Sequence, residues 1–361
     1  VLCIAGTLVI SVAPFLGVAD PLMNNYVPVL QHPMFYAGLG LFGLGFTVLS
    51  LHGLVFSHSI GLTISGDGAL RYGLYTALIA AIVTVVMLVV SWIDMPEFAE
   101  GAFYFELLFW DAGHAVQFVH VQLMLVAWLW MATVAGITIR LSPRIALFIF
   151  TMGMVPVLLT PVAYSLHDLG TASHKQAITQ LMQYGGGLAA VPIGLMIAYS
   201  LFTTSWRDIK VGPEFNALST TMFLFGVGGV IGFMILGSNV TVPAHYHGSI
   251  VAVTLAYMGL TFHLLPRLGF RTPSGKMATL QPLIYAVGQL MHVIGLVWSG
   301  GYGVQRKTAG TDQALDNLER VISMGFMGLG GLIAVIGGIL FLVIVFKAMW
   351  PTHHTGSTIQ T

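Results

Sequence analysis

Long runs of hydrophobic residues, separated by short polar stretches, occupy almost the whole chain. About 20 consecutive apolar residues suffice for a helix to cross the hydrocarbon core of a bilayer. Windows of this kind have approximate cores at 2–19, 27–57, 70–93, 104–138, 144–165, 174–203, 214–237, 243–265, 279–300 and 321–349. Because a spanning segment must satisfy its own backbone hydrogen bonds, each window predicts a helix. The pattern therefore predicts an all-α, polytopic bundle of about ten transmembrane helices, forming one membrane domain over residues 1–361.

Composition supports this class. The chain is 57% hydrophobic and only 7% charged, whereas soluble domains carry roughly 25% charged residues. Its net charge of zero gives no indication of nucleic-acid binding. The single cysteine, Cys3, excludes a disulfide framework, a Cys-rich zinc site and haem attachment through C-x-x-C-H. The first apolar run lacks the basic flank of a cleavable signal, so we expect it to be the first membrane helix.

The distribution of charge predicts the orientation, since cytoplasmic loops of membrane proteins are enriched in Lys and Arg. One set of helix ends carries Arg71, Arg140, Arg144, Arg207, Lys210, Arg267, Arg271, Lys276 and Lys347. The opposite set carries only Lys175, Arg306, Lys307 and Arg320 among basic residues, together with Asp20, Asp94, Glu97, Glu100, Asp168, Asp312, Asp316 and Glu319. We therefore expect both termini in the cytoplasm, with the acidic loops outside the cytoplasmic membrane of a bacterium or archaeon.

Several of the 13 histidines interrupt the apolar windows, and an ionisable residue inside a membrane segment is a functional-site hypothesis by default. His245 and His247 are two residues apart, so on a helix they point about 200° apart. Each can therefore ligate a different metal centre on opposite flanks of one helix. By their distance from the predicted outer helix ends, His32, His114 and His167 lie in the same outer half of the membrane. These five residues predict a layer of metal sites.

Residues 244–247, Ala-His-Tyr-His, resemble a motif of the catalytic subunit of the haem–copper oxidase superfamily, which includes the nitric oxide reductases. The resemblance implies that His245 ligates a high-spin catalytic haem and that His247 ligates a low-spin haem. Residues 31–33, Gln-His-Pro, are similar to the family's second low-spin ligand near the start of an early helix, which implies this role for His32. The family usually has twelve helices; this chain has about two fewer, and the difference falls before the next motif.

The predicted non-haem metal site depends on two further motifs. Residues 110–114, Trp-Asp-Ala-Gly-His, resemble the family's W-x-x-G-H, whose histidine binds that metal. His167 and Asp168 fall where the family usually has His-His, both on the same metal. The register is supported by residues 190–194, Ala-Val-Pro-Ile-Gly, which are similar to a family I-P-T-G turn at a matching distance. The resemblance thus implies His114, His167 and Asp168 as the ligands.

A basic pair completes the resemblance. Residues 303–307, Gly-Val-Gln-Arg-Lys, are similar to the family's basic residues at the haem propionates, which implies this role for Arg306 and Lys307. Both lie on the predicted outer side, where basic residues are otherwise scarce.

Departures from the family pattern bear on the reaction. A tyrosine common in the oxygen reductases is Phe118 here, and residues of two usual proton paths are Val116 and Met196. Asp168 replaces a histidine, and a harder carboxylate ligand favours iron over copper. These differences favour a nitric oxide reductase, with two haems, b type expected, and a non-haem iron, and without strong proton pumping. Oxygen reduction at a copper-containing site is the alternative.

Other readings of single residues remain open. His32 precedes Pro33 and could instead cap a helix. Asp168 could orient His167 without binding the metal itself, which would leave the third ligand position to His120 or His174. His120 lies six residues after the W-x-x-G-H histidine, roughly 240° around the helix, so it faces elsewhere; His174 remains a candidate. The other histidines have no assigned role: His52, His58, His263, His292, His353 and His354.

Two other functional classes compete with this interpretation. A transporter would also place polar residues in the membrane, but it would not need histidine pairs at one depth. A b-haem electron-transfer subunit would need no third metal. Since the sequence has no copper-A, c-haem or quinol motif, we expect electrons from a small donor subunit or a cytochrome c or cupredoxin-type domain, beside other membrane subunits. Further expected partners are the lipid bilayer and the gas NO, or O2 in the alternative.

Overall fold

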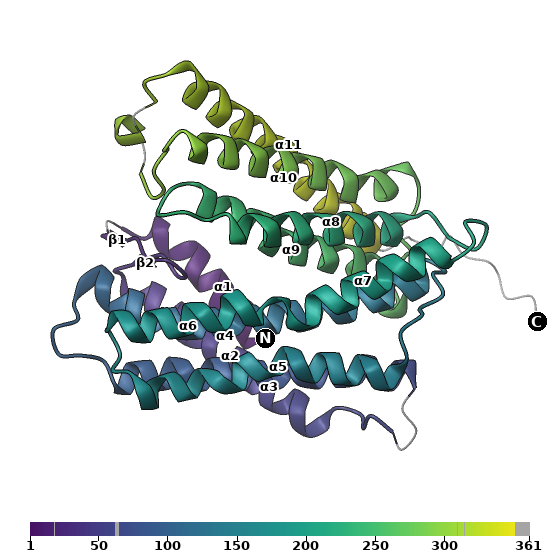
Figure 1. Cartoon of the computed structure of the whole chain (residues 1–361), viewed down its shortest axis with the longest axis horizontal. Coiled ribbons are helices and arrows are strands. Elements are labelled where there is room, and N and C mark those ends of the chain that lie inside the picture. The colour runs from purple at the N-terminus through teal and green to yellow at the C-terminus, as the bar shows by residue number, and fades with distance from the viewer. Residues whose placement is uncertain (18, 62–64, 309, 314, 351–361) are drawn as a thin grey trace, which may run out of the picture. The chain divides into compact units, whose positions relative to one another are not determined.

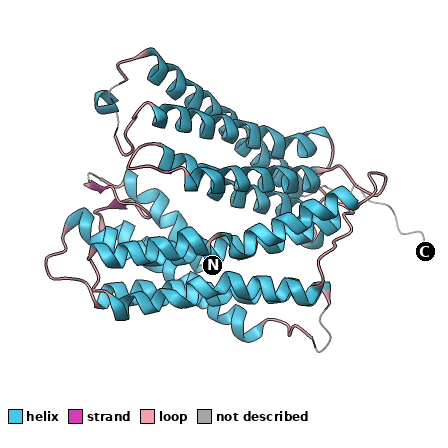
Figure 2. Cartoon of the chain, in the orientation of Figure 1, coloured by secondary structure: helices cyan, strands magenta, loops and turns pink. Residues whose placement is uncertain are grey.

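The computed structural model describes residues 1–17, 19–61, 65–308, 310–313 and 315–350. Its elements are almost all helices, as Figures 1 and 2 show. The α-helices are α1 (Leu2–Val12), α2 (Pro33–Phe56), α3 (Gly66–Ile93), α4 (Gly101–Val134), α5 (Pro143–Leu166), α6 (Ala172–Gly185), α7 (Gly187–Thr203), α8 (Pro213–Phe233), α9 (Thr241–Arg267), α10 (Lys276–Gly301) and α11 (Leu318–Met349). Two 3-10 helices, η1 (Ala13–Phe15) and η2 (Gly310–Gln313), and two short antiparallel strands, β1 (Pro21–Leu22) and β2 (Val29–Leu30), complete the described elements.

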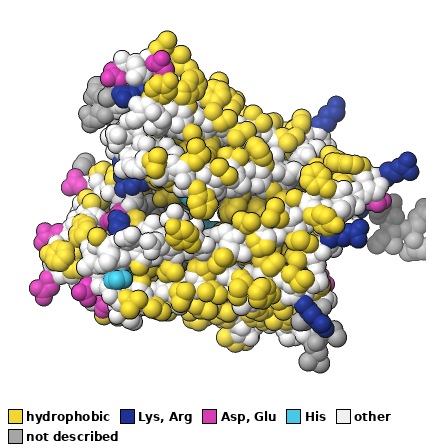
Figure 3. Space-filling model, viewed as in Figure 1, with side chains coloured by type: hydrophobic (Ala, Val, Ile, Leu, Met, Phe, Trp, Pro, Cys, Tyr) yellow, Lys and Arg dark blue, Asp and Glu magenta, His cyan; other side chains and the backbone are white. Residues whose placement is uncertain are grey.

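Nine helical segments within the described residues are long and apolar enough to cross a membrane, with α6 and α7 counted as one span. This confirms an all-helical chain with the character of a multi-pass membrane protein. In Figure 3 hydrophobic side chains cover most of the visible length of the helices, while charged side chains gather at helix ends.

The first predicted window is shorter than expected. The prediction extended a helix over 2–19, but α1 has 11 residues and is therefore only about 16 Å long. Pro14 follows its end within η1, and proline has no backbone N–H with which to continue an α-helix.

The second window begins later than predicted for a related reason. Residues 27–32 were expected to be helical, but β2 and an extended His32 precede α2. Pro28 interrupts the apolar run, and Pro33 occupies the first turn of α2, where its fixed φ suits a helix start. Before α2 the chain instead forms a short hairpin, in which β1 and β2 pair as antiparallel strands.

The helices pack as two compact units, which are described separately. The first comprises residues 1–129 and 139–200, and the second comprises 130–138 and 201–361. Within the first unit α1 packs on α2, α2 on α3, α3 on α5 and α5 on α6. Within the second, α8, α9 and α10 pack on one another and α10 packs along α11. The expectation of one membrane domain over the whole chain stays a prediction.

Candidate metal and haem sites

The start of α9 fixes the orientation of His245 within the second unit. Its Nδ1 lies 2.7 Å from the carbonyl oxygen of Gly228 on α8. Because a carbonyl only accepts hydrogen bonds, the imidazole proton resides on Nδ1 and the lone pair on Nε2. Metal-ligating histidines commonly hold their second nitrogen in this way. A Cβ at Gly232 would lie 2.8 Å from Nδ1, so the glycine makes room for the ring.

His247 faces a different neighbour, as expected for two positions about 200° apart. Its ring centroid lies 4.4 Å from that of His292 on α10, and its buried Nδ1 has no hydrogen-bond partner among the described residues. His292 Nδ1 in turn donates to the carbonyl oxygen of Met327 on α11, at 3.0 Å. An unpaired buried nitrogen costs free energy unless a ligand occupies it. His292 received no role from the sequence, although its distance from the predicted outer end of its helix placed it near the depth of His247.

The loop that carries Arg306 and Lys307 is anchored beside the start of α9. Gln305 forms a β-bridge with Asn239, and Val240 N donates to Val304 O at 3.1 Å. Arg306 is half-buried and Lys307 is exposed. The loop therefore holds both predicted propionate-binding residues next to the helix that carries the His-Tyr-His motif.

His114 on α4 is a buried histidine of the first unit, with 6% of its surface exposed. Its Nδ1 lies 2.8 Å from Trp110 O and 2.9 Å from the hydroxyl of Tyr26. As for His245, donation to a carbonyl leaves the lone pair on Nε2. Gln117 Nε2 donates to the same tyrosine hydroxyl at 3.1 Å. A Cβ at Gly113 would collide with the Tyr26 ring, which explains why this motif position holds glycine here.

A buried acid–imidazole pair lies close to this histidine in the first unit. Asp111 Oδ2 and His174 Nε2 are 2.7 Å apart, and their side chains are 0% and 2% exposed. His174 Nδ1 also donates to the backbone carbonyl of His167, at 3.1 Å. His174 can occupy both contacts either as an imidazolium beside a carboxylate or as a neutral ring beside a protonated acid. In both cases it links α4 to the end of α5.

Two hydroxyl groups extend this pair. The Tyr164 ring contacts the His174 ring edge-on at 4.8 Å, and its hydroxyl lies 2.6 Å from that of Ser91 on α3. Asp111 Oδ1 is buried without a hydrogen-bond partner in the described part of the chain. We call Asp111, His174, Tyr164 and Ser91 the Asp111 cluster. The sequence did not assign Asp111 or Tyr26 a role, although a carboxylate inside the 104–138 window is by itself unusual.

A charged layer borders the cluster. Lys175 Nζ lies 3.9 Å from the centroid of the Trp110 ring and 3.3 Å from Glu106 Oε1. Asn25 N donates to the other oxygen of Glu106 at 2.9 Å. These contacts join the segment before α2 to α4 and α6. The Lys175 ammonium covers one face of the Trp110 ring.

The structure does not gather His114, His167 and Asp168 into one set of ligands. His167 is the half-buried C-cap of α5, and Asp168 is exposed, with its carbonyl oxygen accepting from Thr171 Oγ1 at 2.7 Å. Within the described residues no group of three or more His, Cys, Asp or Glu is placed to hold a metal ion. The buried carboxylate near His114 is that of Asp111 and not that of Asp168. The roles of His167 and Asp168 as metal ligands stay predictions.

His32 has the capping role that the sequence left open. It is the N-cap of α2, and its Nδ1 accepts a hydrogen bond from Met34 N at 3.2 Å. The acceptor nitrogen carries no proton, so a neutral ring holds its proton on Nε2. In this tautomer Nε2 offers no lone pair to a metal, and axial ligation of a haem would require the cap to open.

Comparison with known proteins leaves the family unassigned. No protein-family model matches the sequence. An uncharacterized protein of Rickettsia prowazekii (strain Madrid E) is 29% identical over 388 aligned positions, covering 95% of this chain and 74% of the relative. An uncharacterized protein of Aquifex aeolicus (strain VF5) is 29% identical over 280 positions, covering 77% of this chain and 68% of the relative. The chain thus has relatives of similar sequence in two distant bacteria.

Proposed function

We propose that the chain is the catalytic subunit of a membrane oxidoreductase of the haem–copper oxidase type, most similar to nitric oxide reductases. The reaction would be the reduction of two NO by two electrons and two protons to N2O and water. The observation that carries the proposal is the pair on α9. His245 is held by Gly228 with Nε2 available. His247 faces another direction, and its buried Nδ1 has no hydrogen-bond partner in the described part of the chain.

In this proposal two haems occupy the two flanks of α9. His245 would ligate the high-spin haem and His247 the low-spin haem. His32, the second low-spin ligand that the resemblance implies, would become available only if its cap on α2 opened. Arg306 and Lys307 would bind the propionates, which agrees with the anchoring of their loop at the start of the same helix. When bound, the haems would supply electron transfer to the gas; the protein holds and orients them.

The non-haem metal, iron in this proposal, would be held by His114. His167 and Asp168, which the resemblance implies as further ligands, would have to be brought to it by a rearrangement of the segment after α5. The orientation of His114 supports its role, because Trp110 O engages Nδ1 and leaves Nε2 to a metal. His174 would act as a positioning residue: it holds the His167 carbonyl on one side and Asp111 on the other. Electrons would come from a partner subunit or a soluble donor at the outer face of the cytoplasmic membrane.

Haem and metal quantification on the purified chain, with a reduced-minus-oxidised spectrum and turnover of NO and O2, tests this function. We expect low-spin and high-spin haem, non-haem iron and N2O formation. Copper equimolar with the high-spin haem and rapid O2 consumption without N2O would support an oxygen reductase instead. Low-spin haem alone would indicate an electron-transfer subunit, and a chain without haem would leave a transporter.

Single variants on α9 test the ligand assignment. His245→Ala should abolish the high-spin spectrum and keep the low-spin spectrum, whereas His247→Ala should do the reverse. His263→Ala on the same helix is the matched control and should retain both haems. Equal spectra in all three variants would contradict the assignment.

A further inference from the structure

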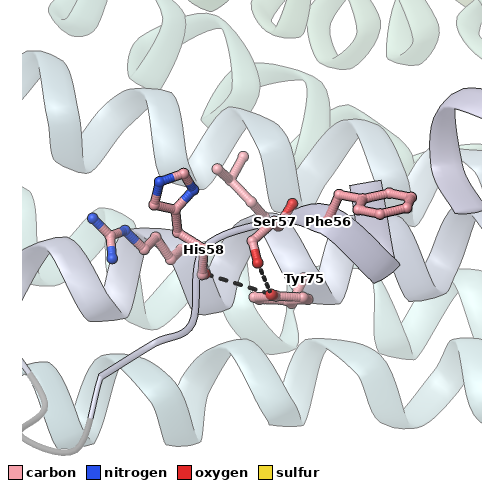
Figure 4. A pocket seen from close by; sticks show the side chains of 6 residues that line it. Phe56, Ser57, His58 and Tyr75 are labelled. Carbon is pink, nitrogen blue, oxygen red and sulfur yellow. Dashed lines mark hydrogen bonds between the residues drawn. The ribbon is translucent and has the colours of Figure 1, made fainter. Parts of the chain in front are cut away.

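A cavity of about 510 Å³ lies where the end of α2 meets the first turns of α3, within the first unit (Figure 4). Its lining comes from Phe56, Ser57, His58, Arg71, Leu74 and Tyr75. A second cavity of about 460 Å³ shares Tyr75 with it and is also lined by Tyr72. The proposed haem and metal ligands do not line either cavity, so this feature is separate from the function proposed above.

Arg71 supplies positive charge that no carboxylate offsets within the described residues. Its guanidinium is exposed, and Nη1 donates to the carbonyl oxygen of Ser59 at 3.1 Å. Asp67 lies one helical turn earlier on α3, yet it forms no ion pair with Arg71 in this part of the chain. A guanidinium has five N–H donors in a fork that matches the oxygens of a phosphate. Donors therefore remain for an anionic ligand in the cavity.

The polar wall of the cavity is held in place by Tyr75. Its hydroxyl lies 3.0 Å from Ser57 O and 3.4 Å from His58 O, and Figure 4 shows these contacts as dashed lines. The phenol thus fixes the turn after α2, where the Ser57 hydroxyl and the His58 imidazole add further hydrogen-bonding groups. Binding then costs little ordering of this wall.

The rest of the lining is apolar and exposed. Phe56 and Leu74 keep 70% and 42% of their surfaces accessible. A cation and hydroxyl groups beside apolar side chains at the end of two spanning helices suit a ligand with an anionic head and hydrocarbon chains. A soluble anion would use only the polar half.

The position of the cavity indicates the leaflet. In the first unit the same set of helix ends carries Arg140 and Arg144, whereas Asp94, Glu97 and Glu100 follow the other ends. By the positive-inside rule this end is cytoplasmic. The cytoplasmic leaflet is rich in anionic lipid, and basic pockets between helices on that side are typical headgroup sites.

We propose that this cavity is a binding site for the phosphate of an anionic phospholipid, with Arg71 as its principal ligand and Phe56 and Leu74 against its acyl chains. His58 and Ser57 complete the polar side. The site would select anionic phospholipid over zwitterionic lipid because the guanidinium charge has no carboxylate counter-ion among the described residues.

The test measures phosphatidylglycerol bound by the chain in nanodiscs that contain phosphatidylcholine and a varied fraction of phosphatidylglycerol. Arg71→Gln should weaken phosphatidylglycerol binding about tenfold or more, as expected for loss of a charge-assisted contact. Arg144→Gln is the matched control, because Arg144 is an exposed arginine at the same set of helix ends that lines neither cavity. It should bind as the unchanged chain does.

Further arms keep the test decisive. Leu74→Trp should fill the cavity and weaken binding while retaining the arginine, which separates occupancy from a folding defect of the Arg71 variant. Inorganic phosphate alone should compete only weakly. Equal losses in the Arg71 and Arg144 variants, equal affinity for phosphatidylcholine, or Arg71-dependent binding of inorganic phosphate without lipid preference would each overturn the proposal.

Discussion

Asp111 and His174 form a buried polar contact whose two ends depend on each other. Both side chains are almost fully enclosed at 2.7 Å separation. Removing one partner leaves the other buried and unsatisfied, which typically costs about 1–3 kcal/mol. We expect Asp111→Ala and His174→Ala each to lower the melting temperature in detergent. The double variant should lose less stability than the sum of the two single losses, because contacting residues are coupled by about 0.5–3 kcal/mol. Asp94→Ala, at an exposed position, is the control; additive losses would contradict a direct coupling.

The Tyr26 ring, rather than the backbone conformation, excludes a larger residue at position 113. An added Cβ would meet the tyrosine ring, and overpacking of this kind costs about 1–3 kcal/mol. We expect Gly113→Ala to lower the free energy of unfolding by that amount and to displace the tyrosine hydroxyl from His114. Gly43→Ala on α2 is the control, because none of the described residues lies within 4 Å of an added Cβ there. It should leave the free energy of unfolding nearly unchanged when both variants are compared by thermal denaturation.

At the scale of elements, glycines set how closely α10 and α11 approach. A Cβ at Gly330 would collide with the backbone at His292, and one at Gly288 would collide with the backbone of Ala334. Small residues at such positions allow membrane helices to pack through their backbones. We expect Gly330→Val to separate the two helices and to lower the melting temperature strongly or prevent folding.

A neighbouring glycine on the same helix provides the control. No atom of the described chain lies within 4 Å of a Cβ added at Gly328, so Gly328→Val should leave the melting temperature almost unchanged. Both substitutions change helix propensity and hydrophobicity equally, and the two variants differ only in the face of α11 that they occupy. Equal melting temperatures would show that this interface does not depend on glycine.

Helix starts and ends were predicted well where apolar runs met polar residues and less well near prolines. The runs themselves locate the spans because only a long apolar helix satisfies both its backbone and the lipid. Pro14 and Pro28 lie inside apolar runs, so hydropathy alone extended the predicted helices through them. The structure replaced those stretches by η1 and by strand β2.

At the scale of the whole molecule, charge asymmetry predicts the orientation of the chain. Replacing Cys3, the only cysteine, by serine permits single cysteines to be placed at exposed sites. Glu97→Cys, between α3 and α4, should react with a membrane-impermeant maleimide added outside intact cells. Ser142→Cys, between α4 and α5, should react only after permeabilisation. The reverse pattern would place the acidic loops in the cytoplasm.

The sequence by itself determined the membrane class, the helical architecture and most of the spans, because hydrophobicity and charge act on each segment independently of its neighbours. It also predicted His245 and His247 on opposite flanks of one helix, since helical geometry fixes their relative direction. Tertiary structure decided the rest. It placed Asp111 against His174, Tyr26 against His114 and His292 against His247, and left Asp168 exposed. Such pairs join segments that are distant in sequence, and only packing of the helices determines which buried polar groups find partners.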